Sequence, residues 1–160
     1  MKLGLALREV HRSETELAEA LLHLSERHAV VHDVHLLARD LAAWSADHVR
    51  QVAEAAHDQG EDLDPDPVRD PGVTRRVRER LSEALGRARA PELALLSDLR
   101  TVYVLAHGVA SDWELIGQAA QGVRARDLVD LSQRCRSETI RQARWADAML
   151  KESATQILVS

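Results

Sequence analysis

Two glutamates occupy positions where amphipathic helices are expected to bury apolar side chains. The sequence Arg-Ser-Glu-Thr occurs at residues 12–15 and again at residues 136–139, and it contains Glu14 and Glu138. Around Glu14, apolar residues recur in alternating steps of four and three, so the carboxylate interrupts an apolar heptad stripe. A carboxylate in such a stripe needs a partner, because an unpaired buried charge is very unfavourable. The stripe consists of Leu3, Leu7, Val10, Glu14, Leu17, Leu21, Leu24 and His28.

A cluster of histidines is the second candidate for chemistry. The spacings from His28 to His32 and from His32 to His35 place imidazoles on one face of a helix, a geometry typical of zinc sites. No cysteine or carboxylate is spaced to complete a tetrahedral site unless the chain brings His23 back to the others. Histidines are common on protein surfaces, so solvated side chains are the leading interpretation of this cluster.

Four long helices are expected to position these residues. Apolar periodicity predicts helices over residues 3–28, 33–59, 91–121 and 127–155. The break before residue 33 contains no glycine or proline. It is predicted because one helix of about 60 residues would be anomalous in a chain of this size.

The predicted helix ends depend on capping residues. Gly60 is expected to end the second helix as a C-terminal cap, and Pro91 is a favourable first residue for the third. Gly122 is expected to stop the third helix, and Asp127 to act as the N-cap of the fourth.

The connection over residues 60–90 differs from the other two. An acidic, proline-rich stretch over residues 61–72 precedes a basic amphipathic segment, residues 73–89, which predicts a short extra helix. The outer connections are short and require antiparallel neighbours, whereas about 30 residues can traverse a bundle and leave the second and third helices parallel. The sequence therefore predicts an all-α fold, a single four-helix domain over residues 1–160 with the order up, down, down, up.

Composition excludes several classes of protein. A chain of 160 residues can bury roughly 70% of its unfolded surface without disulfides or structural metal. The net charge of −5 argues against nucleic acid as a partner, because phosphate binding needs a basic face. The single Cys135 cannot form an intramolecular disulfide, and neither a signal peptide nor a membrane span is evident. We expect a cytoplasmic protein with no membrane partner, and the abundance of Arg and Ala suggests a bacterial source.

The predicted topology, with carboxylates projecting inward at mid-helix, resembles the ferritin-like superfamily. Ferritin-like di-iron proteins place one Glu on each of two helices and Glu-x-x-His on each of the other two. On this resemblance Glu14 matches the lone Glu of the first helix. Residues 45–48 match the motif on the second helix with His48 in place, but Ser45 stands where Glu belongs.

The match is weaker on the other two helices. Residues 138–141 have Glu138 in place, but Arg141 stands where His belongs. The third helix offers only His107 and Asp112 near the corresponding level. An intact di-iron centre needs about six ligands, so the resemblance implies a di-iron motif that has degenerated.

Two interpretations of the central residues stay open. In the leading one, Arg141 and His48 neutralise Glu14 and Glu138 in a polar layer that sets helix register without chemistry. In the other, Glu14, His48 and Glu138, with His107, hold a single Fe, Mn or Zn ion, since three protein ligands are the minimum for such a site.

The predicted third helix contains two glycines in its interior. Gly108 and Gly117 each cost about 1 kcal/mol relative to alanine, and close approach of a neighbouring helix would explain them. A small-ligand cavity beside Gly108 and His107 is a further option, because bundle cores host such sites.

These features together predict a function only in outline. We expect a ferritin-like bundle that has lost its di-iron centre, binds no cofactor and acts as a non-catalytic binding or interaction module. The alternative is a metalloprotein with one Fe, Mn or Zn ion doing redox or oxygen chemistry. No catalytic residue is assigned, and the sequence leaves catalysis open. Because ferritin-like bundles commonly pair through helix faces, the resemblance implies a homo-oligomer, with a dimer favoured.

Overall fold

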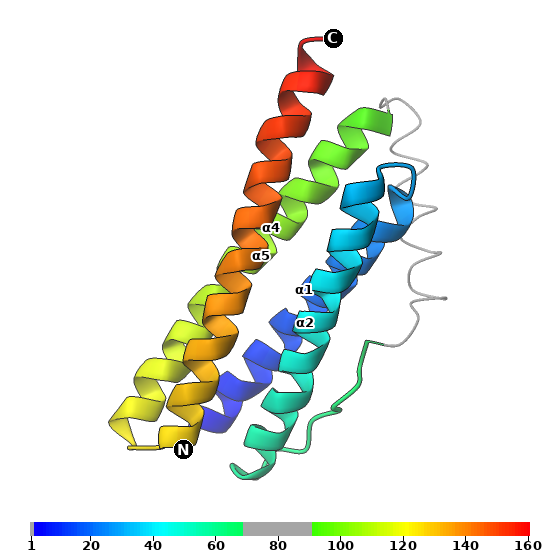
Figure 1. Cartoon of the computed structure of the whole chain (residues 1–160). Coiled ribbons are helices and arrows are strands. Elements are labelled where there is room, and N and C mark those ends of the chain that lie inside the picture. The colour runs from blue at the N-terminus through cyan, green and yellow to red at the C-terminus, as the bar shows by residue number, and fades with distance from the viewer. Residues whose placement is uncertain (1, 69–90) are drawn as a thin grey trace.

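The computed structural model describes residues 2–68 and 91–160, and every regular element in those residues is a helix. The elements are α1 (Leu3–Arg27), α2 (His32–His57), α4 (Pro91–Gly122) and α5 (Arg126–Leu158) (Figure 1). The prediction of an all-α chain with four long helices is confirmed. The extra helix predicted over residues 73–89 lies outside the described residues.

The α1–α2 connection is a tight turn between two separate helices, as predicted. The N–H of His28 still donates to the carbonyl of Leu24, at 3.2 Å, and the N–H of Val31 donates to the carbonyl of His28, at 2.9 Å. After α2, Gly60 has a φ of 79°, a left-handed conformation that favours glycine. The N–H of Glu61 then donates to the carbonyl of Ala56 at 3.0 Å, so Gly60 ends α2 as a C-terminal cap.

The α4–α5 connection begins where predicted, but its capping residues differ from the prediction. Gly122 is the last residue of α4, and the left-handed residue of this turn is Arg124, with a φ of 59°. Ala125 occupies the N-cap position of α5 and makes no side-chain cap hydrogen bond. Its N–H donates to the carbonyl of Ala120 at 2.9 Å, which closes the turn through the backbone. The prediction of Asp127 as the N-cap is therefore wrong, and this residue lies in the first turn of α5.

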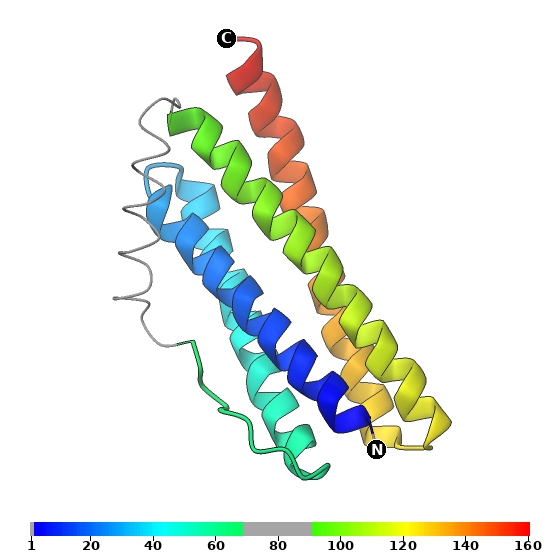
Figure 2. The ribbon, with the colours of Figure 1, turned by 180° about the vertical axis from the view of Figure 1, so that it is seen from behind.

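The helices lie as two neighbouring pairs. Figures 1 and 2 show α1 and α2 running antiparallel beside each other, with α4 and α5 forming a second antiparallel pair. The two pairs meet mainly where α1 packs against α4, with fewer contacts between α2 and α5. In both views α4 begins at the end of the bundle where α1 turns into α2, and it finishes near the N-terminus of the chain.

The segment after α2 folds back beside α1. Glu61 forms an ion pair with Arg8, and the His11 ring Nε2 lies 2.6 Å from the carbonyl oxygen of Asp64. A Cβ on Gly4 would lie 3.0 Å from Cγ of Glu61, so this glycine lets the segment approach α1 closely.

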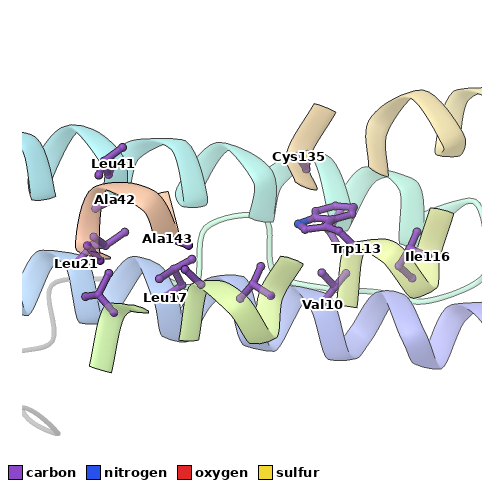
Figure 3. Close-up of a cluster of buried hydrophobic side chains, with 14 of the residues drawn as sticks. Val10, Leu17, Leu21, Leu41, Ala42, Trp113, Ile116, Cys135 and Ala143 are labelled. Carbon is purple, nitrogen blue, oxygen red and sulfur yellow. The ribbon is translucent and has the colours of Figure 1, made fainter. Parts of the chain in front are cut away.

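The core is a continuous cluster of aliphatic side chains from all four helices, with one tryptophan. Figure 3 shows Trp113 near Val10, Ile116 and Cys135, while the leucines and alanines labelled at the other end of the close-up complete the packing. Several buried polar residues interrupt this core, and five of them gather around the middle of the bundle. They are Glu14, Ser45, His48, Thr139 and Gln142.

Candidate functional site

His48 lies between the two glutamates, one of which is buried. Its Nδ1 is 2.7 Å from Glu14 Oε1, and its Nε2 is 2.6 Å from Glu138 Oε2. The side chains of Glu14 and His48 are 0% and 1% exposed, whereas that of Glu138 is 37% exposed. Both ring nitrogens must carry a proton to donate to two ionised carboxylates, so this geometry fits an imidazolium. The structure thus brings Glu14, His48 and Glu138 together, but the expectation that Glu138 lies on the buried stripe of its helix is wrong, because its side chain is at the edge of the bundle.

The surroundings of His48 stabilise its protonated form. Burial by itself lowers the pKa of His48, but its contacts with Cys135 and Glu14 and the negative charge of Glu14 outweigh that effect. The net effect raises the pKa of His48 from 6.5 to about 11. The ring therefore keeps its proton at neutral pH and acts as the cation that compensates the buried carboxylate.

Within residues 2–68 and 91–160, the hydrogen bonds to Glu14 all reach one of its two carboxylate oxygens. Trp113 Nε1 donates to Glu14 Oε1 at 2.7 Å, alongside His48. The hydroxyl of Thr139 is 3.5 Å from the same oxygen but donates at 2.8 Å to the carbonyl of Cys135. Glu14 Oε2 is buried without a hydrogen-bond partner among the described residues. A buried carboxylate oxygen in this position is where a water or a cation would bind.

Arg141 does not join the polar layer, and the prediction that it neutralises the glutamates is wrong. Its side chain is exposed, with the guanidinium carbon 5.1 Å from the centroid of the Trp44 ring. Gln142 is buried instead, and its Nε2 donates to the carbonyl of Leu41 at 2.9 Å and to Ser45 Oγ at 3.0 Å. The inward face of α5 thus lies one residue further along the chain than predicted, which corresponds to a rotation of about 100°.

His107 also lies away from the central residues. Its ring is exposed and packs edge-on against Tyr103, with ring centroids 4.6 Å apart. Asp112, the other candidate on this helix, accepts a hydrogen bond from Ser13 Oγ at 2.7 Å. The structure therefore does not assemble the predicted four-ligand metal set. Within residues 2–68 and 91–160, no group of three or more His, Cys, Asp or Glu side chains is arranged to hold a metal ion.

A surface groove between α4 and α5 contains His107. It has a volume of about 700 Å³, and Tyr103 and Arg144 also line it. The ion pair between Arg136 Nε and Glu114 Oε2, 2.9 Å long, spans the two helices in this groove. Gly108 is not among the lining residues, so the groove differs from the predicted cavity beside Gly108 and His107.

Two of the histidines near the first turn approach Asp98 in α4, whereas a third contacts the backbone of α1. His28 Nε2 lies 2.7 Å from Asp98 Oδ2, and His23 Nε2 lies 4.0 Å from the same oxygen. The Nδ1 of His35 is 2.9 Å from the carbonyl oxygen of Ser25, while His32 is exposed. The His28–Asp98 distance fits a hydrogen bond that ties the turn to α4, and the His35–Ser25 distance fits one that ties α2 to α1. Among the described residues these histidines do not form a zinc site.

The sequence interpretation missed Asp98 as the partner of this cluster. Asp98 lies in α4, about 70 residues from His28, and its side chain is only 14% exposed. Arg27 also contributes a contact, with Nη1 3.4 Å from Asp98 Oδ2. The available signal was an acidic residue within the mostly apolar stretch over residues 93–111, and only the packing of α1 against α4 supplies its partners.

Comparisons with protein-family models, curated proteins and solved structures found no match for this chain. Chemically, the described residues provide a buried charge network centred on His48 and a groove of mixed polar and apolar lining on the outer surface of α4 and α5. The network can set the register of α1, α2 and α5, because its members bond to one another across three helices.

Proposed function

We propose that the chain is a ferritin-like helical bundle, with the order up, down, down, up, that has lost the di-iron centre and serves as a non-catalytic binding or interaction module. The course of the helices in Figures 1 and 2 supports this topology. The position of Glu14, His48 and Glu138 at one level of the bundle supports the relation to a carboxylate–histidine centre. We keep the cytoplasmic location and the lack of a nucleic-acid or membrane partner as parts of the same proposal.

The contacts of His48 are the observation that supports the loss of the metal centre. Both ring nitrogens of His48 lie within 2.7 Å of carboxylate oxygens, so neither has a lone pair directed toward a metal ion. A histidine binds a metal only as the neutral ring, so metal binding must displace a proton. With a pKa of about 11, His48 holds that proton strongly at neutral pH.

The charge network then has a structural role. Removing one partner from a buried ion pair is strongly destabilising, whereas an intact network adds little stability over an apolar core. We attribute its retention to helix register, since the network links Glu14 in α1 to His48 in α2 and Glu138 in α5. A bundle with a set register presents constant outer surfaces, which suits an interaction module.

A single metal ion is the alternative, and the buried Glu14 Oε2 favours it. This atom has no hydrogen-bond partner among the described residues, and a cation would satisfy it. To hold one Fe, Mn or Zn ion with three protein ligands, Glu14, Glu138 and a deprotonated His48 would have to rearrange, because no three such groups among the described residues are arranged around a metal position. An Fe or Mn ion would supply redox or oxygen chemistry at the centre of the bundle, whereas Zn would act only as a Lewis acid.

Elemental analysis of the purified full chain separates the two proposals. The chain is expressed with Fe, Mn and Zn in the medium, and the metal per chain is measured together with that of a His48→Gln variant. We expect substoichiometric metal in both proteins. One ion per chain that is lost in the His48→Gln variant would establish the alternative. Two ions per chain bridged by Glu14 and Glu138 would contradict both proposals and indicate an oxidase.

A further inference from the structure

The face of α4 opposite the core carries a second heptad stripe. Its members are all uncharged and all exposed, and they follow one another in alternating steps of four and three. This stripe, which we name the outer seam, differs from ordinary helix surfaces, where charged residues dominate. The outer seam consists of Ser97, Thr101, Val104, Gly108, Ser111, Leu115 and Gln118.

Much of the apolar surface of α4 is not buried by the other helices of the bundle. By length and composition alone, Pro91–Gly122 is apolar enough to cross a membrane, but only 33% of its most apolar 18-residue window is buried. The core helix of a soluble protein with this composition would be mostly buried. In the outer seam, Val104 is 51% exposed and Leu115 is 66% exposed.

Gly108 at the middle of the outer seam has no explanation within the described part of the chain. A Cβ added at Gly108 would meet no described atom within 4 Å. At Gly117, by contrast, an added Cβ would lie 3.0 Å from Ser132 Oγ, so this second glycine admits the close approach of α5. Glycine in a helix interior is destabilising, and close approach of another backbone is its usual use. At Gly108 the approaching helix is missing from residues 2–68 and 91–160.

We propose that a second copy of this chain supplies that helix, so that two α4 helices pair antiparallel through their outer seams about a two-fold axis near His107. The inference names one partner of the proposed interaction module and in this sense rests on that proposal. An isologous pairing requires a self-complementary surface. In this arrangement Val104 lies opposite Gly108 of the second copy, and Leu115 lies opposite Ser97, so that each large side chain meets a small one.

Charge complementarity selects the antiparallel direction. Arg100 and Glu114 lie on one edge of the outer seam, seven residues before and seven residues after His107. A two-fold axis at the level of His107 therefore brings each Arg100 opposite Glu114 of the second copy. Parallel pairing would bring each edge residue against the other edge of the second copy, where Arg100 meets Leu105 and Glu114 meets Ala119, so this attraction would be absent.

Sedimentation equilibrium of the full chain tests the proposal. We expect a dimer whose dissociation constant rises about tenfold or more in Arg100→Glu, because each dimer then gains two like-charge contacts. Glu114→Arg should weaken the dimer similarly, although it also breaks the ion pair with Arg136. The double variant Arg100→Glu with Glu114→Arg should restore the dimer. Failure of the double variant to recover would overturn the antiparallel geometry.

A matched pair of variants tests the surface itself. Val104→Asp should abolish the dimer, whereas Val30→Asp, at a valine that is 96% exposed in the α1–α2 turn, should leave it unchanged. Circular dichroism of each variant is the control that tests whether it is folded. A wild-type chain that is monomeric at all accessible concentrations would overturn the proposal, and so would a dimer that survives Val104→Asp.

Two further measurements distinguish other occupants. Co-sedimentation with vesicles of neutral and anionic phospholipid that is lost in Val104→Asp would assign the outer seam to a membrane and overturn the proposal. The metal content per chain tests the proposed loss of the centre, and it does not depend on the mass of the assembly. Failure of either proposal is therefore visible without failure of the other.

Discussion

The two copies of Arg-Ser-Glu-Thr direct different residues into the bundle. In α1 the glutamate is inward, and Glu14 is fully buried. In α5 the threonine is inward, so that Thr139 is fully buried while Glu138 is 37% exposed. Identical local sequence thus has opposite consequences, because the apolar residues three and four positions away decide which face of a helix is buried.

The comparison explains why His48 bridges unequal partners. Glu14 has no access to solvent and needs the imidazolium of His48 and the indole N–H of Trp113. Glu138 lies at the edge of the bundle, where water can hydrate its charge. The central network therefore has one partner that is indispensable and one that water can replace, and the following predictions test this difference.

The largest effect is expected at His48. Replacing His48 by Leu should lower the free energy of unfolding by about 3–5 kcal/mol, because it leaves the charge of Glu14 buried without its cation. Urea denaturation followed by circular dichroism measures this change. The double variant Glu14→Leu with His48→Leu should be much less destabilised than the single variant. Equal destabilisation of the two proteins would contradict a buried charge pair.

The pH dependence of stability should follow the proton on His48. Its folded pKa of about 11 lies above the unfolded value of 6.5, so its stabilising contribution is complete below pH 6.5 and is lost as pH rises toward 11. The free energy of unfolding should therefore fall between pH 7 and pH 10 more steeply in the wild type than in the Glu14→Leu, His48→Leu variant. An NMR titration in which His48 loses its proton near pH 6.5 would refute this prediction.

Neutralising each glutamate in turn compares the two copies directly. Glu14→Gln should cost about 2–3 kcal/mol, because it removes a buried, charge-assisted hydrogen bond, whereas Glu138→Gln should cost about 1 kcal/mol or less. Urea midpoints at pH 7 measure both variants under the same conditions. Similar values for the two variants would mean that the two carboxylates share one environment.

The smallest effects test the register of α5. Arg141→Met should change stability by about 0.5 kcal/mol, because Arg141 is exposed and loses only its contact with Trp44. Gln142→Met should cost about 1 kcal/mol, because Gln142 is buried and donates two hydrogen bonds. Thermal melts of matched samples measure both changes. If Arg141→Met costs more stability than Gln142→Met, the helix register predicted from the sequence is the correct one.

Local features of the sequence determined the elements of this protein. The apolar periodicity and the signals at Gly60 and Pro91 predicted helix boundaries within a few residues of α1, α2, α4 and α5. Because Glu14 interrupts an otherwise apolar stripe, its burial and its need for a cation could also be predicted. These properties depend on residues within a few turns of the chain, and so a single sequence contains them.

Only the tertiary structure decided which residues meet. The inner face of α5 includes Ser132, Thr139 and Gln142, and such a mixed stripe specifies helix rotation poorly. Packing against α2 and α4 selects that rotation. As a result Gln142, and not Arg141, faces the centre of the bundle. The contact of His28 with Asp98 likewise joins residues about 70 positions apart, for which the chain carries no local signal. Partners between helices follow from how apolar faces fit together, and this fit is a property of the whole bundle.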